Sequence, residues 1–134
     1  MPKAIKITAR LADAPAKRAE QVKIKAQLND GPTAKLIAEA LPIKARGQRW
    51  GGEIYFSIPV KADLEDDCRD VLKAGELGYW PTGNAFCIFF GPTPASVKDE
   101  IRAASDVNII GKVKGDISKL WDVPDGAEVI IEAD

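Results

Sequence analysis

Two segments near the start of the chain alternate apolar and polar side chains with a period of two. Residues 5–11 carry Ile, Ile, Ala and Leu at every second position, and residues 22–28 repeat the pattern with Val, Ile, Ala and Leu. The positions between them hold mostly Lys, Thr, Arg and Gln. One apolar face and one charged face are typical of a strand in an antiparallel sheet with a core on one side. We therefore expect two such strands, joined by a polar connection over residues 13–20.

The rest of the chain continues as short strand patterns separated by turn signals. We expect a helix over 33–41 that ends at Pro42, then strand segments over 43–60 with a bend at Gly51-Gly52. A loop or short helix over 63–74 is followed by two strands within 76–90 around a turn at 81–84, and by a short helix that opens at Pro94 with Ser96 as its cap. The chain is expected to end with a strand over 107–114, a helical piece near Leu120 and a last strand over 129–131. Long helices between strands are missing, which argues against a doubly wound parallel sheet. The pattern predicts one mainly β domain over residues 1–134, a closed barrel or a sandwich with two or three short helices.

Composition excludes several classes of function. The 134 residues include no histidine, so no mechanism can use a histidine base, ligand or triad. A net charge of −1 lacks the basic footprint of a nucleic-acid-binding domain. The two cysteines, Cys68 and Cys87, are too few for a disulfide framework or for a zinc site without histidine. No glycine-rich phosphate-binding motif is present. We expect no metal, no cofactor and no nucleic-acid partner.

The same sequence argues for a cytoplasmic protein. The first residues alternate charge with apolar side chains, unlike a signal peptide, and no apolar run approaches the length of a membrane span. Reduced cysteines fit that compartment. We expect a protein of the cytoplasm with no membrane partner.

Charge is distributed unevenly between the two ends of the chain. Residues 1–28 hold seven basic and two acidic side chains, whereas residues 115–134 hold one basic and six acidic. Opposite charges suit strands that lie next to one another in one sheet. A second interpretation is that either face docks on a partner protein or on a second copy of the chain.

Aromatic residues gather in two segments of the sequence. Adjacent strand residues point to opposite faces, so one of Tyr79 and Trp80 should point into the core and the other outward or into a groove. Cys87 lies in an apolar run and is expected to be an inert core thiol. The aromatic side chains predict a groove for an apolar or proline-bearing ligand, a small molecule or a peptide, with polar groups beside them that fix its orientation. The predicted ligand-binding residues are Arg46, Trp50, Glu53, Tyr55, Tyr79, Trp80, Thr82, Asn84 and Phe89.

Three segments resemble a known family. Residues 75–94, GELGYWPTGNAFCIFFGPTP, residues 50–56, WGGEIYF, and residues 108–111, NIIG, match the pattern of the cyclophilin-like proteins of bacteria and archaea, small domains of largely unassigned function. The agreement spans about residues 22–132. The resemblance implies a closed, eight-stranded, mainly antiparallel barrel capped by short helices.

True cyclophilins are peptidyl-prolyl isomerases on that barrel, and the resemblance therefore implies a second function to consider. Their segment with paired phenylalanines is similar to residues 83–90, but they carry their catalytic arginine in a Phe-His-Arg strand motif. The counterpart here, residues 53–58, contains neither Arg nor His. Arg46 or Arg49 would have to lie over the groove to take that role.

We therefore weigh three hypotheses. The first is a binding module that holds a small molecule or peptide in an aromatic-lined groove. The second is a peptidyl-prolyl isomerase, which needs a cation near the groove to stabilise the twisted amide. The third, by analogy with related barrels, is a subunit of a multi-component amide-hydrolysing enzyme.

Overall fold

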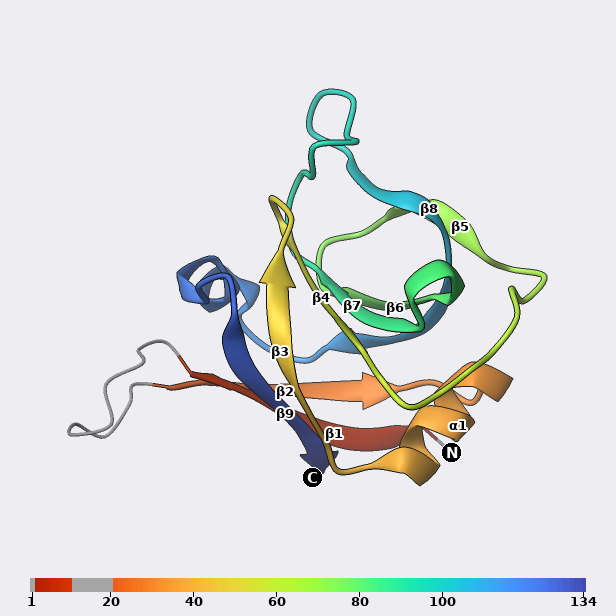
Figure 1. Cartoon of the computed structure of the whole chain (residues 1–134). Coiled ribbons are helices and arrows are strands. Elements are labelled where there is room, and N and C mark those ends of the chain that lie inside the picture. Colours follow the sequence, from red (N-terminus) through yellow and green to blue (C-terminus); the bar gives the residue numbers. More distant parts are fainter. Residues whose placement is uncertain (1, 11–20) are drawn as a thin grey trace.

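The computed structural model describes residues 2–10 and 21–134 (Figure 1). Its elements in chain order are β1 (Lys3–Arg10), β2 (Gln21–Leu28), α1 (Pro32–Ala40), β3 (Ile43–Arg49), β4 (Glu53–Ser57), β5 (Arg69–Leu72), β6 (Glu76–Trp80), the 3-10 helix η1 (Pro81–Gly83), β7 (Ala85–Phe89), β8 (Ile101–Val113), the 3-10 helix η2 (Ile117–Asp122) and β9 (Ala127–Ala133). The chain is mainly β, as the alternating patterns predict. The predicted connection over residues 13–20 lies outside the described residues.

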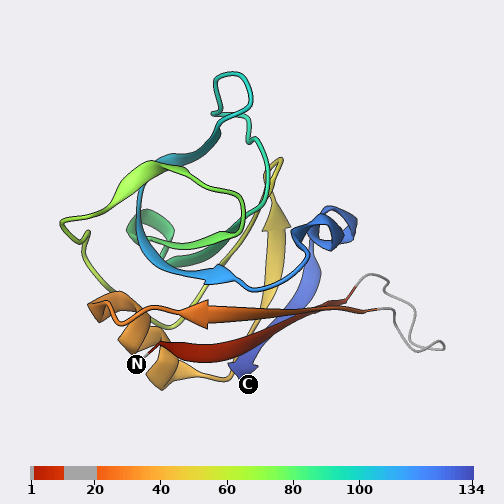
Figure 2. The same ribbon diagram turned by 180° about the vertical axis from the view of Figure 1, so that it is seen from behind.

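Antiparallel pairing joins eight of these strands into a closed ring. The strand order is β2-β1-β9-β3-β4-β7-β6-β8, and β8 also pairs with β2, which closes the ring. The ninth strand, β5, pairs with β8 alone. The figures show α1 beside one end of the ring and η2 beside β9 (Figures 1 and 2). This architecture confirms the predicted eight-stranded barrel with short helices.

The two ends of the chain lie side by side in the ring. Strand β1 pairs with β9 along five residue pairs, from Ile5 opposite Ala133 to Ala9 opposite Val129. Across this pair, Lys6 Nζ lies 3.6 Å from a carboxylate oxygen of Glu132. The expectation that the basic and acidic ends form neighbouring strands is confirmed, although exposed ion pairs of this kind contribute little to stability.

The inside of the ring is an apolar core. Alternate residues of each strand point inward, so that Ile54 and Phe56 of β4 meet Phe86 and Ile88 of β7 there. The rings of Phe56 and Phe86 stack with centroids 5.4 Å apart.

A second apolar cluster lies on the outer side of the same wall. Strand β8 pairs with β2 and β6 only through residues 108–113. The preceding segment, residues 101–107, pairs with β5 at Ile101, Arg102 and Val107 and curves away from the ring (Figure 2). This curved segment packs on the outward side chains of β7. The buried members of the cluster are Leu72, Ala85, Cys87, Phe89, Ile101, Ala103 and Val107. The β4-β7-β6 wall is therefore covered on both faces near β8.

Two of the predicted elements differ from the structure. Residues 94–100 form turns rather than a helix, because Ser96 does not cap a helix: its Oγ accepts hydrogen bonds from the backbone N–H of Thr93, at 2.9 Å, and of Arg102, at 3.1 Å. Residues 101–106, expected in part as helix, instead begin β8. The segment 63–74, expected as a loop or short helix, contains the short strand β5.

Ring closure depends on a close backbone approach at Gly111. This residue lies opposite Leu28 of β2 and Leu77 of β6, and a Cβ atom placed on it would lie 2.1 Å from the carbonyl oxygen of Gln27. That oxygen belongs to the backbone and cannot move without shifting β2. Only glycine fits between the two strands here.

We predict that Gly111→Ala lowers the free energy of unfolding by at least about 2 kcal/mol, because the methyl group would force β2 and β8 apart. Gly115→Ala is the matched control, since a Cβ there meets nothing within 4 Å, and its effect should stay within about 0.5 kcal/mol. Urea denaturation of both variants measures the difference. Equal stability of the two would show that β2–β8 closure tolerates a side chain.

Candidate functional site

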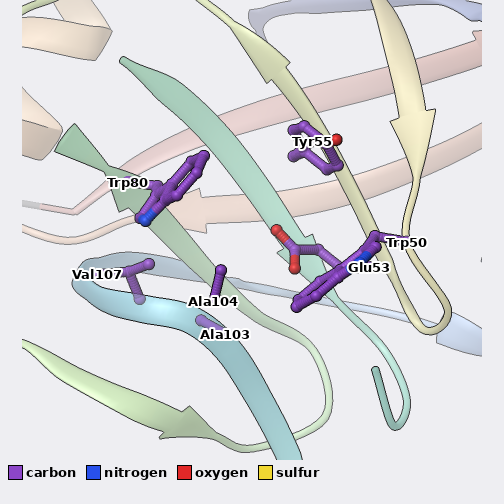
Figure 3. Close-up of a pocket in the computed structure, with 7 residues that line it drawn as sticks. All are labelled: Trp50, Glu53, Tyr55, Trp80, Ala103, Ala104 and Val107. Atoms are coloured by element: carbon purple, nitrogen blue, oxygen red, sulfur yellow. The ribbon is translucent and has the colours of Figure 1, made fainter. Parts of the chain in front are cut away.

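The outer cluster leaves a pocket between the β4-β7-β6 wall and the curved segment of β8. Its volume is about 220 Å³. Seven side chains line it: Trp50, Glu53, Tyr55, Trp80, Ala103, Ala104 and Val107 (Figure 3). Four of them are predicted site residues, and the structure brings these four together from the β3–β4 turn, β4 and the end of β6.

The turn between β3 and β4 fixes the position of Trp50. Gly52 donates a backbone hydrogen bond to Pro92 O and accepts bonds from the N–H groups of Phe90 and Gly91. A Cβ on Gly52 would lie 2.3 Å from the carbonyl carbon of Gly91, so the two backbones are in direct contact. The predicted bend at Gly51-Gly52 is confirmed, and it anchors the rim of the pocket to the segment after β7.

Hydrogen bonds within the protein occupy the polar edges of two of the aromatic walls. The hydroxyl of Tyr55 donates to Oε1 of Gln48 at 2.9 Å. The indole Nε1 of Trp80 donates to Oγ of Ser105 at 2.6 Å. Both rings are thereby fixed in orientation.

Glu53 is the charged residue of the pocket lining. It is only 6% exposed, and Figure 3 shows its carboxylate pointing into the space between Trp50, Tyr55 and Trp80. Within residues 2–10 and 21–134, no ion pair involves this carboxylate. Burial raises the pKa of Glu53 from 4.5 to about 7, opposed by a hydrogen bond from the thiol of Cys87. The carboxyl group can therefore exchange a proton near neutral pH.

Cys87 belongs to the outer cluster and is a hydrogen-bond partner of Glu53. It is buried, opposite Tyr55 in the β4–β7 pairing, and burial and the Glu53 carboxylate both raise the pKa of its thiol well above the usual value. A thiol that stays protonated is a poor nucleophile, which agrees with the inert core cysteine expected from the sequence.

The other predicted site residues lie elsewhere. Phe89 is fully buried in the outer cluster, below the pocket. Tyr79 points into the ring, with its hydroxyl 2.6 Å from Val60 O and 3.1 Å from Oδ1 of Asn84. Thr82 is exposed on η1, and Arg46 is exposed with its Nη1 bonded to Gly126 O at 3.1 Å. Of Tyr79 and Trp80, one points inward and the other into the pocket, as predicted.

Arg49 is held at the end of the ring, outside the pocket lining. Its guanidinium donates to Gly51 O and to Val123 O, the latter at 2.7 Å. The Cζ atom lies 5.2 Å from the ring centroid of Phe90 and 5.5 Å from that of Trp121. Neither Arg46 nor Arg49 therefore lies over the aromatic pocket.

Sequence reasoning missed the wall that β8 supplies. Ala103, Ala104 and Val107 line the pocket, but the strand was expected to begin only at residue 107. Small alanines carry no periodic or chemical signal that would have identified them.

Among the described residues there is no group of three or more Cys, Asp and Glu side chains placed to hold a metal ion, and no helix long and apolar enough to cross a membrane.

We predict that Glu53→Gln removes a pH-dependent destabilisation. Well below pH 4.5 the carboxyl group is neutral in both the folded and the unfolded state. Between pH 4.5 and about 7 the unfolded chain releases a proton that the folded protein keeps, so stability falls as pH rises, and the full loss is present above pH 7. The shift corresponds to about 3 kcal/mol. The variant should be more stable than the natural protein at about pH 8, and the gap should close towards about pH 4.

Urea denaturation of both proteins across this pH range tests the prediction. All other titrating groups are shared, so the difference between the two curves isolates Glu53. A gap that does not change with pH would mean that the carboxyl group titrates normally.

Comparisons with known proteins agree with this fold. The family model described as Cyclophilin-like matches residues 17–132. The chain is 36% identical to the hypothetical protein AF2241 from Archaeoglobus fulgidus; the match covers 100% of this chain and 98% of that one, and its solution structure superposes with a TM-score of 0.75. No curated protein matches the chain. Because the family model matches most of its length, this chain belongs to the cyclophilin-like family.

Proposed function

We propose that this protein binds a small molecule, or one side chain of a peptide, in the pocket between β4, β6 and β8. The observation that carries the proposal is the buried Glu53 carboxylate at the centre of three aromatic side chains. Burying an ionisable group without an ion pair costs folding free energy. Proteins tend to keep such groups where a ligand or a reaction uses them.

The size of the pocket limits the ligand. About 220 Å³ is below the range of roughly 300–1,000 Å³ that is typical of sites for drug-sized molecules. A compact ligand or a single ring fits this volume. The walls are mostly apolar, with few polar groups, which is the usual composition of a specific small-ligand site.

The charges around the pocket favour binding over proline isomerisation. An isomerase needs a cation or donor that stabilises the twisted amide. The charged group that lines this pocket is the carboxylate of Glu53, while Arg49 is bonded to backbone carbonyls at the end of the ring. The arrangement therefore supports a binding protein more strongly than an isomerase.

An NMR screen of small, water-soluble fragments tests the proposal. Trp50 and Trp80 line the pocket, whereas Trp121 packs on Phe90 elsewhere and is 49% exposed. The indole N–H signals of the first two should shift with bound fragments, and that of Trp121 serves as an internal control. Single Trp→Phe variants assign the three signals.

We predict that Ala104→Phe weakens fragment binding at least about tenfold, because an aromatic side chain on this exposed alanine fills the pocket without entering the core. Ala133→Phe places the same ring on another exposed strand residue, in β9, and should leave binding unchanged. If no fragment shifts the Trp50 and Trp80 signals, or if Ala104→Phe leaves the shifts intact, the pocket is not the binding site.

A further inference from the structure

The chemistry of the pocket points to a ligand of positive charge. The polar atoms of Tyr55 and Trp80 are engaged with Gln48 and Ser105, so what these two lining residues have left to offer a ligand is the surface of their rings. The face of an aromatic ring carries partial negative charge. Ring faces of Trp and Tyr are for this reason the preferred surroundings of ammonium and quaternary ammonium groups.

Once it has lost its proton, the carboxylate of Glu53 adds a full negative charge at the same place. None of the seven side chains that line the pocket is basic. The thiol of Cys87 is only a weak donor to the carboxylate, which points into the cavity (Figure 3). An anionic or neutral ligand would leave the ionised carboxylate without a counter-charge and so favour its protonated form, whereas a cation would stabilise the ionised form.

We propose that the ligand of this pocket is a compact organic cation, an amine that is protonated or fully alkylated, held between the rings of Trp50, Tyr55 and Trp80 against the carboxylate of Glu53. The inference rests on the proposed function and adds the chemical class of the ligand. The volume of about 220 Å³ restricts the cation to a small head group with a short body.

Binding of such a cation should be linked to the protonation of Glu53. The ionisable groups that share its surroundings are Cys87 on β7 and Tyr55 on β4. The charged groups on the neighbouring elements are engaged elsewhere or exposed. Arg102 of β8 forms ion pairs with Asp70 and Glu100, and Glu76 of β6 forms one with Arg69. Arg49 of β3 donates to backbone carbonyls, and Asp106 of β8 is exposed. The chain contains no histidine, so no imidazole titrates in the same range. A permanently charged ligand should bind more tightly as pH rises through the range in which Glu53 loses its proton.

Choline and 3,3-dimethylbutan-1-ol form a matched pair of probes. They have the same shape, and the quaternary nitrogen of choline is replaced by a neutral carbon. Titrations followed by the Trp50 and Trp80 indole signals give both dissociation constants. At about pH 8.5 we expect choline to bind about tenfold more tightly than the alcohol. At about pH 5.5 the ratio should fall several-fold, because Glu53 is then largely neutral.

Glu53→Gln supplies the second arm of the test. In this variant the ratio of the two dissociation constants should stay, at every pH, at the value that the natural protein shows at about pH 5.5. The affinity for the neutral alcohol should be unchanged or higher. The ratio of the two probes in the natural protein needs no variant, so the test stands even if the substitution alters stability.

The outcomes separate the two proposals. Equal or tighter binding of the alcohol at about pH 8.5 overturns the cation inference and leaves the proposed function in place. Binding of neither probe also overturns the inference, because a compact cation that fits the pocket fails to bind; the fragment screen then decides on the proposed function alone. A preference for choline that survives in Glu53→Gln overturns the role of the carboxylate.

Discussion

Closure of the ring by β8 is the constraint on which the rest of the structure depends. Strand β8 reaches β2 only because Gly111 lets its backbone come within contact distance of the Gln27 carbonyl. Residues 108–113 are thereby committed to the ring, and the preceding residues 101–107 must leave it over the outer face of β7. The second apolar cluster and the pocket both follow from that path. Gly78 contributes to it, since a Cβ there would lie 2.9 Å from Val107.

Much of the fold could be predicted from local patterns. The charged alternation of residues 22–28 identified β2 because a period of two with one apolar face is typical of a half-buried strand and does not fit the period of a helix. The turn predicted at residues 81–84 is present, and its last residue, Asn84, has a left-handed backbone with φ of 48°. These features are set by neighbouring residues, which is why a single sequence reveals them.

The outer half of β8 was not predictable for the opposite reason. Residues 103–105, Ala-Ala-Ser, have low strand propensity and lie between the positions at which β8 pairs with β5. Their extended path follows from the pairing on either side and from the packing of Ala103 in the outer cluster. Glu53 is among the predicted site residues, but its burial was hidden in the same way. Its position alternates with Ile54 and would face solvent in an uncovered barrel, so its burial depends on a segment about fifty residues later in the chain. The aromatic cluster was visible in the sequence, but its division into Tyr79 inside and Trp80 outside required the register.

The two-sided wall separates the residues that set ligand preference from those that hold the barrel together. Along β7, residues 86 and 88 belong to the inner core and residues 85, 87 and 89 to the outer cluster, so the floor of the pocket is constrained by packing on both sides. The rim is different: Ala104 is exposed, lies outside the ring and packs in neither cluster. Substitutions there can reshape the pocket at little cost to the fold. Divergence of ligand preference between barrels of this kind is therefore expected to concentrate in the first half of β8, while the floor beneath it stays the same.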